Sequence, residues 1–281
     1  MTLHHLHDLA VDFTQNSPSN HLREETALEP ELAGIKLCDP PIIGVASAGD
    51  DYLRSLQNNA QARLNQAPAS FWLESARSVI SLFFPFTRQV CESNRVDMRR
   101  PSTAFVHARN EGHAFINQVC DQIRAALEEC GYAVAIPAID PRFWAAKETP
   151  VNGQTFSSNW SERHVAYACG LGTFSLHKGI ITRLGTAGRL ASIITDLELP
   201  PTPRPYTELD EYCSRCGACA KNCPVGAITL EGGKDHIPCR AFLAEIEDVQ
   251  AYKARKYIAG CGKCQINVPC ERQIPPRRNR P

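Results

Sequence analysis

Long apolar runs are absent from this sequence. No segment approaches the roughly 18 apolar residues of a membrane-spanning helix, so we expect no membrane association. Neither charge sign is in excess, because 30 Lys and Arg balance 30 Asp and Glu, which gives no global reason to expect nucleic-acid binding. The start, MTLHHLHDLAVDF, lacks the basic stretch and apolar core of a secretory signal. These absences predict a cytoplasmic protein.

Cysteine, by contrast, is abundant, with 13 residues. Four of them form the run C-x2-C-x2-C-x3-C, which Pro224 follows directly: Cys213, Cys216, Cys219 and Cys223. This spacing is typical of a bacterial iron–sulfur site, where three thiolates bind one cubane and the fourth binds a second one. A zinc ribbon is the alternative, but it normally uses two separated C-x2-C pairs.

A second set of cysteines lies downstream and is irregular: Cys239, Cys261, Cys264 and Cys270. In two-cluster ferredoxins the last cysteine of each run binds the other cluster. That rule predicts one 4Fe–4S cluster on Cys213, Cys216, Cys219 and Cys270, and another on Cys223, Cys239, Cys261 and Cys264. One cluster with spare thiols is the alternative, because Cys239 stands far upstream of Cys261 and Pro269 precedes the last cysteine.

The remaining sequence predicts helices alternating with strands. Residues 78–86, SVISLFFPF, read as a buried strand that Pro85 either ends or places at a sheet edge. Apolar residues recur every four positions from Phe115 to Leu127, which predicts a helix over about 102–129 with Gly131 beyond its end. YAVAIPAI predicts a second buried strand, and Asp50 or Asp51 a cap for a helix over 52–64. Together these elements indicate an α+β domain.

The segment 157–199 has a distinct pattern. Asn159 with Glu162 forms a variant of the capping box, which predicts a helix from Trp160 to about Ala168 that stops at Gly170. Strands are expected at 179–182 and 190–197. The GLG turn follows a helix and precedes a strand, which is the wrong order for a phosphate-binding loop. Its glycines either admit a large flat ligand close to the backbone or simply form turns.

This segment, WSERHVAYACGLG followed by GIIT and GTAGRLASIITDLEL, resembles the epoxyqueuosine reductase family and the related corrinoid-dependent reductive dehalogenases. The resemblance covers roughly residues 40–272. It implies a nitroreductase-like cobalamin-binding domain followed by a ferredoxin-like domain with two 4Fe–4S clusters. In that family the clusters reduce the cobalamin, which then acts on the substrate, and the cofactor performs the difficult chemistry.

Three departures from the family separate this chain from tRNA modification. The position of the family's catalytic Asp is Phe156 here, GTFSLHKGIIT replaces a GWIGKN stretch, and the chain ends eleven residues after its last cysteine, where the family has a tRNA-binding extension. We therefore interpret the chain as a divergent paralogue. The expected organisation is a helix and linker at 1–30, a cofactor domain at 31–199, a bicluster domain at 206–272 and a basic, disordered tail at 273–281.

Candidate site residues follow from this resemblance. Proton donors are expected among His164, Tyr167, His177 and Lys178, although the first two would lie within a helix and could serve only packing. Corrin contacts are expected from residues in or near the glycine turns, with a surface salt bridge as the alternative role of Arg189: Gly170, Gly172, Thr173, Thr182 and Arg189.

Three functions remain open at this point. The first is a cytoplasmic iron–sulfur reductase whose clusters reduce a bound corrinoid that acts on a small molecule or modified nucleoside. Its electron donor would be a flavodoxin or ferredoxin. The second is an electron-transfer or corrinoid-reducing partner without substrate chemistry, which the missing Asp favours. The third is epoxyqueuosine reduction on tRNA, with Arg272, Arg277, Arg278 and Arg280 touching phosphate.

Overall fold

The computed structural model describes residues 1–57, 65–146, 149 and 155–276, and its centre is a four-stranded antiparallel sheet. The strands are β1 (Ile42–Ser47), β2 (Ser78–Pro85), β3 (Val134–Ala135) and β6 (Gly188–Thr195), in the order β1-β2-β6-β3. Every residue of β2 is buried, as its apolar run predicts. β2 lies between β1 and β6, so the alternative of an edge strand is wrong and Pro85 only ends the strand.

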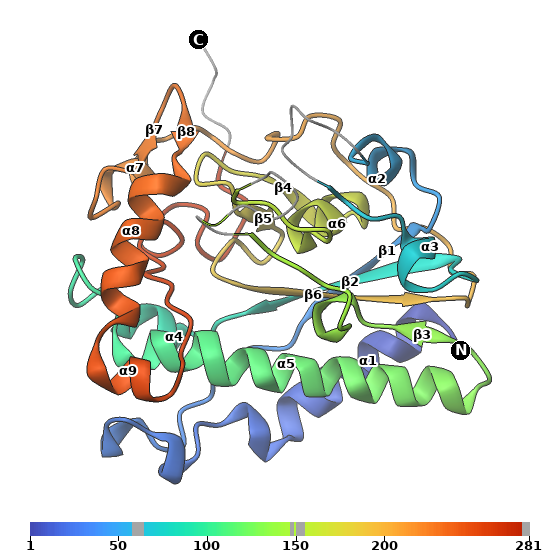
Figure 1. The fold of residues 1–281 in the computed structure, drawn as a ribbon, viewed down its shortest axis with the longest axis horizontal. Coiled ribbons are helices and arrows are strands. Elements are labelled where there is room, and N and C mark those ends of the chain that lie inside the picture. Colours follow the sequence, from blue (N-terminus) through green and yellow to red (C-terminus); the bar gives the residue numbers. More distant parts are fainter. Residues whose placement is uncertain (58–64, 147–148, 150–154, 277–281) are drawn as a thin grey trace.

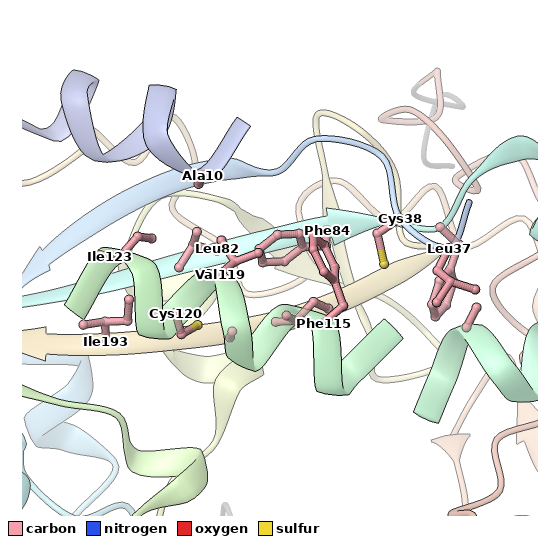
Figure 2. Packing of buried hydrophobic residues seen from close by; sticks show 14 of the residues in the cluster. Ala10, Leu37, Cys38, Leu82, Phe84, Phe115, Val119, Cys120, Ile123 and Ile193 are labelled. Carbon is pink, nitrogen blue, oxygen red and sulfur yellow. The ribbon is translucent and has the colours of Figure 1, made fainter. Parts of the chain in front are cut away.

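One face of the sheet is covered by α5 (Thr103–Glu129) and α1 (Leu3–Asn16), which lie together in Figure 1. The Ser102 side chain caps α5 by accepting a hydrogen bond from the Phe105 amide, and Gly131 takes a left-handed conformation just beyond its end. The expected helix over 102–129 is therefore present. Its apolar stripe packs on β2 and β6, where Phe115 and Ile123 face the core (Figure 2).

The opposite face carries α6 (Glu162–Ala168), α2 (Asp51–Ser55), α3 (Ala69–Trp72) and the small sheet of β4 (Gly172–Phe174) and β5 (Ile180–Thr182). The predicted capping box of α6 is wrong. The helix begins two residues later than expected, with Ser161 at the cap position. The Asn159 side chain instead accepts from the Trp144 amide and donates to the Arg142 carbonyl, because it pins an adjacent loop.

Two other expectations need correction. The strand predicted from YAVAIPAI is only the two half-buried residues of β3, since Pro137 starts a 3-10 helix (Pro137–Ile139). The helix predicted over 52–64 is capped by Asp50 as expected and is seen as α2, while residues 58–64 lie outside the described part of the chain. Three further 3-10 turns precede β1: Pro18–Asn20, Glu24–Thr26 and Pro30–Leu32.

The cysteine-rich part lies beside α4 (Arg88–Ser93) and the start of α5 (Figure 1). It contains α7 (Ala218–Lys221), β7 (Ile228–Thr229), β8 (Gly233–Lys234), α8 (His236–Glu247) and α9 (Gln250–Ala254). Asn94 and Lys263 join the two parts, because the fully buried ammonium of Lys263 donates to the Asn94 carbonyl (2.6 Å) and to its side-chain oxygen (2.7 Å). The cysteine segment is thus fixed to the main core by buried polar contacts.

No helix in the described ranges combines the length and apolarity that crossing a membrane would require.

Candidate functional site

The eight cysteines of the two predicted sets line two separate cavities. A narrow cavity of about 20 Å³ is lined by Cys213, Cys216, Cys219 and Cys270. A second cavity of about 220 Å³ is lined by Cys223, Cys239, Cys261 and Cys264. The cysteines that line each cavity are thus those of one predicted set of four, while cluster binding and the exchange of Cys223 and Cys270 between the runs stay predictions.

A third cavity, of about 480 Å³, lies between α5, α6 and β6. It shares Arg109, Arg163, Gly179 and Gln265 with the second cysteine cavity, so the two adjoin. Its wall combines aromatic side chains such as Trp160 with several charged groups. A cavity of this size, partly apolar with a few inward polar groups, is typical of small-molecule sites.

Glu162 is held in this cavity by a chain of hydrogen bonds. The Trp160 indole donates to the Ser192 hydroxyl (2.8 Å), and that hydroxyl donates to Oε1 of Glu162 (3.0 Å). The other carboxylate oxygen, Oε2, is buried without a partner. Burial raises the pKa of Glu162 to about 7, although Ser192 and Arg189 oppose the rise. A carboxyl group with this pKa can both hold and release a proton at neutral pH.

The same cavity is lined by Arg189 and His113, and each has an unpartnered buried nitrogen: Nε of Arg189 and Nδ1 of His113. Burial, reinforced by Arg109, lowers the pKa of Arg189 to about 9. Burial, followed by the charges of Arg189 and Arg109, lowers the pKa of His113 to about 4, so its imidazole is neutral at pH 7. Buried polar atoms are almost always hydrogen-bonded, so this group of unpartnered atoms indicates a ligand site.

The raised pKa of Glu162 has a testable consequence for stability. Because the pKa of Glu162 is higher in the folded state than in the unfolded state, the native protein binds more protons between these two values. The contribution of Glu162 to the free energy of unfolding therefore falls as pH rises from about 4.5 to about 7. Glu162→Gln removes that dependence. We expect the variant to gain stability relative to the wild type over this pH window, by on the order of 1 kcal/mol or more, and to hold the gain above it. Thermal melts at several pH values measure the difference.

The exposed Glu128→Gln variant is the matched control for loss of one carboxylate. A difference between Glu162→Gln and wild type that stays flat across this pH range would contradict the raised pKa.

Two of the predicted proton donors lie at the cysteine cavities. His177 lines both of them and Lys178 lines the second. The His177 side chain is 3% exposed, its Nδ1 accepts from the Gly179 amide and its Nε2 is buried without a partner. Burial, with Lys234 nearby, lowers the pKa of His177 to about 3, so this imidazole is neutral with its hydrogen on Nε2.

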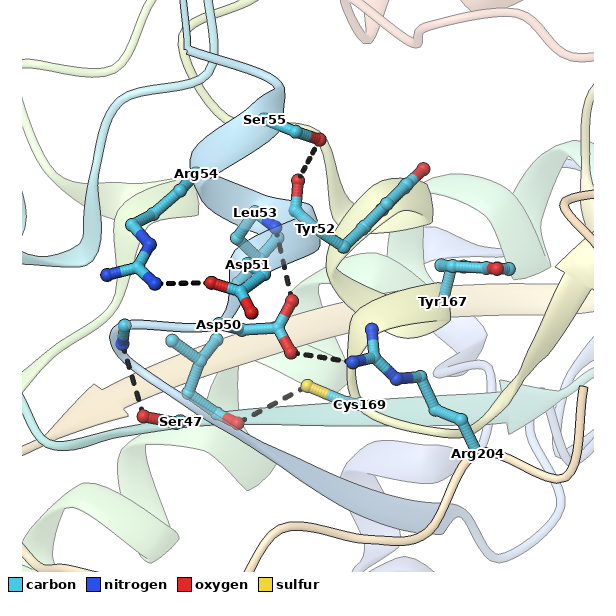
Figure 3. Close-up of polar contacts among 12 residues, drawn as sticks. Ser47, Asp50, Asp51, Tyr52, Leu53, Arg54, Ser55, Tyr167, Cys169 and Arg204 are labelled. Atoms are coloured by element: carbon cyan, nitrogen blue, oxygen red, sulfur yellow. Dashed lines mark hydrogen bonds and ion pairs between the residues drawn. The ribbon is translucent and has the colours of Figure 1, made fainter. Parts of the chain in front are cut away.

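The other two predicted donors make packing contacts elsewhere. The Tyr52 hydroxyl is 2.6 Å from Nδ1 of His164, and the Tyr167 hydroxyl donates to the Thr207 carbonyl at 3.2 Å. Figure 3 places Tyr52 and Tyr167 near each other beside the Asp50–Arg204 ion pair, with ring centroids 4.6 Å apart. Neither His164 nor Tyr167 lines any of the three cavities described above.

Of the five predicted corrin contacts, only Arg189 lines the large cavity. Gly172 lets β4 and β5 approach, since a Cβ there would lie 2.0 Å from the Ile181 carbonyl oxygen, and Gly170 admits the 200–206 linker in the same way. Thr173 accepts from the Tyr212 amide, and Thr182 closes the turn before Gly185. These contacts support the alternative interpretation, in which the glycines and threonines form turns and packing contacts.

Apart from Arg189, sequence reasoning missed the site residues of the large cavity. Arg109 and His113 stand four apart on α5, a spacing that places them on one helix face, but nothing local shows which cavity that face meets. Glu162 was assigned to a helix cap instead. Only the crossing of α5, α6 and β6 reveals their common site.

This chain is similar in sequence and in fold to known proteins. A 4Fe–4S binding domain matches residues 209–229. The epoxyqueuosine reductase of Yersinia pestis is 33% identical over 117 residues, which make up 40% of this chain and 28% of that protein. The epoxyqueuosine reductase structure from Streptococcus thermophilus matches with a TM-score of 0.52 at 19% identity, over 84% of this chain and 64% of that one.

A catabolic reductive dehalogenase in complex with 3-bromo-4-hydroxybenzoic acid matches with a TM-score of 0.52 at 14% identity, over 83% of this chain and 30% of that one. The chain thus spans less than two thirds of the proteins it matches. The resemblance seen in the sequence is confirmed: this chain, with a 4Fe–4S binding segment, is similar in sequence to epoxyqueuosine reductases and shares a fold with them and with reductive dehalogenases.

Proposed function

We propose that this protein is an iron–sulfur reductase in which two 4Fe–4S clusters pass electrons to a corrinoid bound in the large cavity. The observation that carries the proposal is the contact between cavities: Arg109, Arg163 and Gly179 belong to the walls of both the large cavity and the second cysteine cavity. An acceptor in the large cavity would therefore lie next to the second cluster, with the first cluster behind it.

The residues of the large cavity suit a corrinoid. A corrin ring carries amide side chains, and amides donate and accept hydrogen bonds. The cavity offers unpartnered atoms of both kinds, among them Oε2 of Glu162, Nε of Arg189 and Oγ1 of Thr186. Its volume of about 480 Å³ lies within the usual range of small-molecule sites, roughly 300–1,000 Å³, but is smaller than a whole cobalamin, so only part of a corrinoid would lie inside it. When bound, the corrinoid would supply a strongly reducing centre able to attack an electrophilic substrate.

The chain's own residues then divide into roles. The two cysteine sets hold the clusters, and the neutral His177, placed at both sets, can donate from Nε2 to cluster sulfur. Glu162, fixed through Ser192, is positioned to hold a proton on Oε2 and release it toward a bound molecule. We thus assign the acid function to Glu162, in place of the family's Asp, rather than to His164 or Tyr167. The electron donor would be of the flavodoxin or ferredoxin type.

The alternative of a pure electron carrier is less well supported. A carrier needs a cluster near a flat surface, whereas this chain places a polar cavity beside its second cysteine set. The tRNA alternative relied on the arginine tail. Arg272 is engaged by Asp39 (2.7 Å) and the Phe86 carbonyl, while Arg277, Arg278 and Arg280 lie outside the described residues. A deletion strain with unchanged epoxyqueuosine would exclude it.

Anaerobic purification followed by addition of cobalamin tests the proposal. We expect about eight irons per chain, from two four-iron clusters, together with uptake of one corrinoid followed by its absorbance. The matched control is Glu162→Gln, which should keep all the iron because Glu162 lies outside the cysteine cavities. Full iron content without corrinoid uptake would favour the electron carrier.

A further inference from the structure

Arg189 is a charged side chain without a partner in the described part of the chain. No hydrogen bond or ion pair is formed by its guanidinium, and its Nε is buried. The side chain is half-buried, and it lines the large cavity. A guanidinium has five donors in a planar fork and stays charged, so a buried Nε without a hydrogen-bond acceptor is unfavourable. Such a group indicates a ligand that supplies the missing hydrogen-bond acceptors.

No acid in the cavity neutralises Arg189. Among the described lining residues, Glu162 is the one carboxylic acid; it acts electrostatically on Arg189 but forms no ion pair with it. Its Oε1 is already taken by Ser192. The charge of Arg189 therefore faces open cavity space.

The neighbouring Arg109 increases this positive excess. Arg109 and His113 project from α5 into the same cavity, and Arg109 acts electrostatically on Arg189. Arg109 donates from Nε to the Ala259 carbonyl and, like Arg163, also lines the second cysteine cavity, where the proposed thiolate-bound cluster would bring negative charge. Arg189 lines only the large cavity and lacks that compensation.

We propose that Arg189 binds a carboxylate or phosphate group of the molecule that occupies the large cavity, with His113 beside it as a second hydrogen-bond donor. The planar fork matches these groups with two parallel hydrogen bonds. The inference rests on the proposed function, because it specifies the ligand of that same site. The anionic group belongs either to the substrate or to the phosphodiester of the corrinoid's nucleotide tail.

The first test compares Arg189→Met with wild type in cluster-loaded protein without corrinoid. If Arg189 serves a ligand, removing an unpaired charge leaves the melting temperature unchanged or raises it. In wild type, benzoate or inorganic phosphate should bind saturably by calorimetry, and Arg189→Met should weaken the binding by about tenfold or more. The exposed Arg183→Met is the matched control and should bind as wild type.

The second test identifies the source of the anion by comparing cobalamin with cobinamide, which lacks the nucleotide tail. If Arg189→Met weakens cobalamin but not cobinamide, the tail phosphate is the anion. If it weakens neither, while benzoate or phosphate binding is lost, the anion is the substrate's. The inference is overturned if Arg189→Met lowers the melting temperature and neither the wild type nor Arg189→Lys binds benzoate or phosphate. Anion binding without corrinoid uptake removes the proposed function alone.

Discussion

Replacing Cys270 by Ala is expected to abolish the cluster that we propose for the first cysteine run, although Cys270 belongs to the downstream set. It lines the same narrow cavity as the three cysteines proposed as the other ligands, so that cavity has no spare thiol to replace it. Each cubane needs its own set of thiolates, so iron should fall from about eight to about four per chain. Iron analysis and electron paramagnetic resonance of the dithionite-reduced protein measure the loss.

The reciprocal change is Cys223→Ala, which should remove the other cluster although Cys223 ends the first run. The two variants are expected to lose different resonance signals. Cys130→Ser is the control, because this cysteine is exposed and lines none of the three cavities. If both variants lost the same signal, the exchange of cysteines between the runs would be refuted.

Asn94→Ala is expected to loosen the cysteine segment and to cause rapid loss of the second cluster. The fully buried Asn94 side chain donates to the Cys261 carbonyl and accepts from the Ser102 amide and from Lys263. Truncation leaves the Lys263 ammonium, the Cys261 carbonyl and the Ser102 amide short of hydrogen-bond partners. We expect this to lower the free energy of unfolding by about 2–4 kcal/mol. Chelator-driven loss of iron over time, together with the melting temperature, measures the effect.

Asn110→Ala is the matched comparison, since Asn110 also links α5 to the cysteine part but through exposed contacts with Ile258. Its effect should be several times smaller, because exposed hydrogen bonds exchange readily with water. Equal effects of the two variants would mean that burial of Asn94 does not matter for holding the segment.

The sequence alone determined the features that depend on local spacing. The C-x2-C-x2-C-x3-C run specifies its chemistry because a cubane requires thiolates at short, fixed intervals. The four-residue recurrence from Phe115 to Leu127 specifies α5, since this period matches a helix turn and its apolar stripe must be buried. The α+β arrangement around the buried β2 followed from the same periodicities.

Local patterns failed where a side chain had two possible partners. Asn159 reads as a helix cap, yet it bonds to Trp144 and Arg142, because a loop that lies earlier in the sequence packs beside it and competes for its amide. Gly170 and Gly172 were expected near a ligand, but the linker and β5 occupy the space that they free. Sequence spacing contains no information about which of two distant backbones approaches a glycine.

Only the tertiary structure decided the candidate site. Arg109 and His113 on α5, Glu162 on α6 and Arg189 on β6 are far apart in the chain, and the packing of two helices against one strand brings them to one cavity. The sequence shows that charged groups exist at these positions. Whether they stay in water or are desolvated together, which is what shifts the pKa of Glu162 and leaves Arg189 unpaired, depends on how the elements pack.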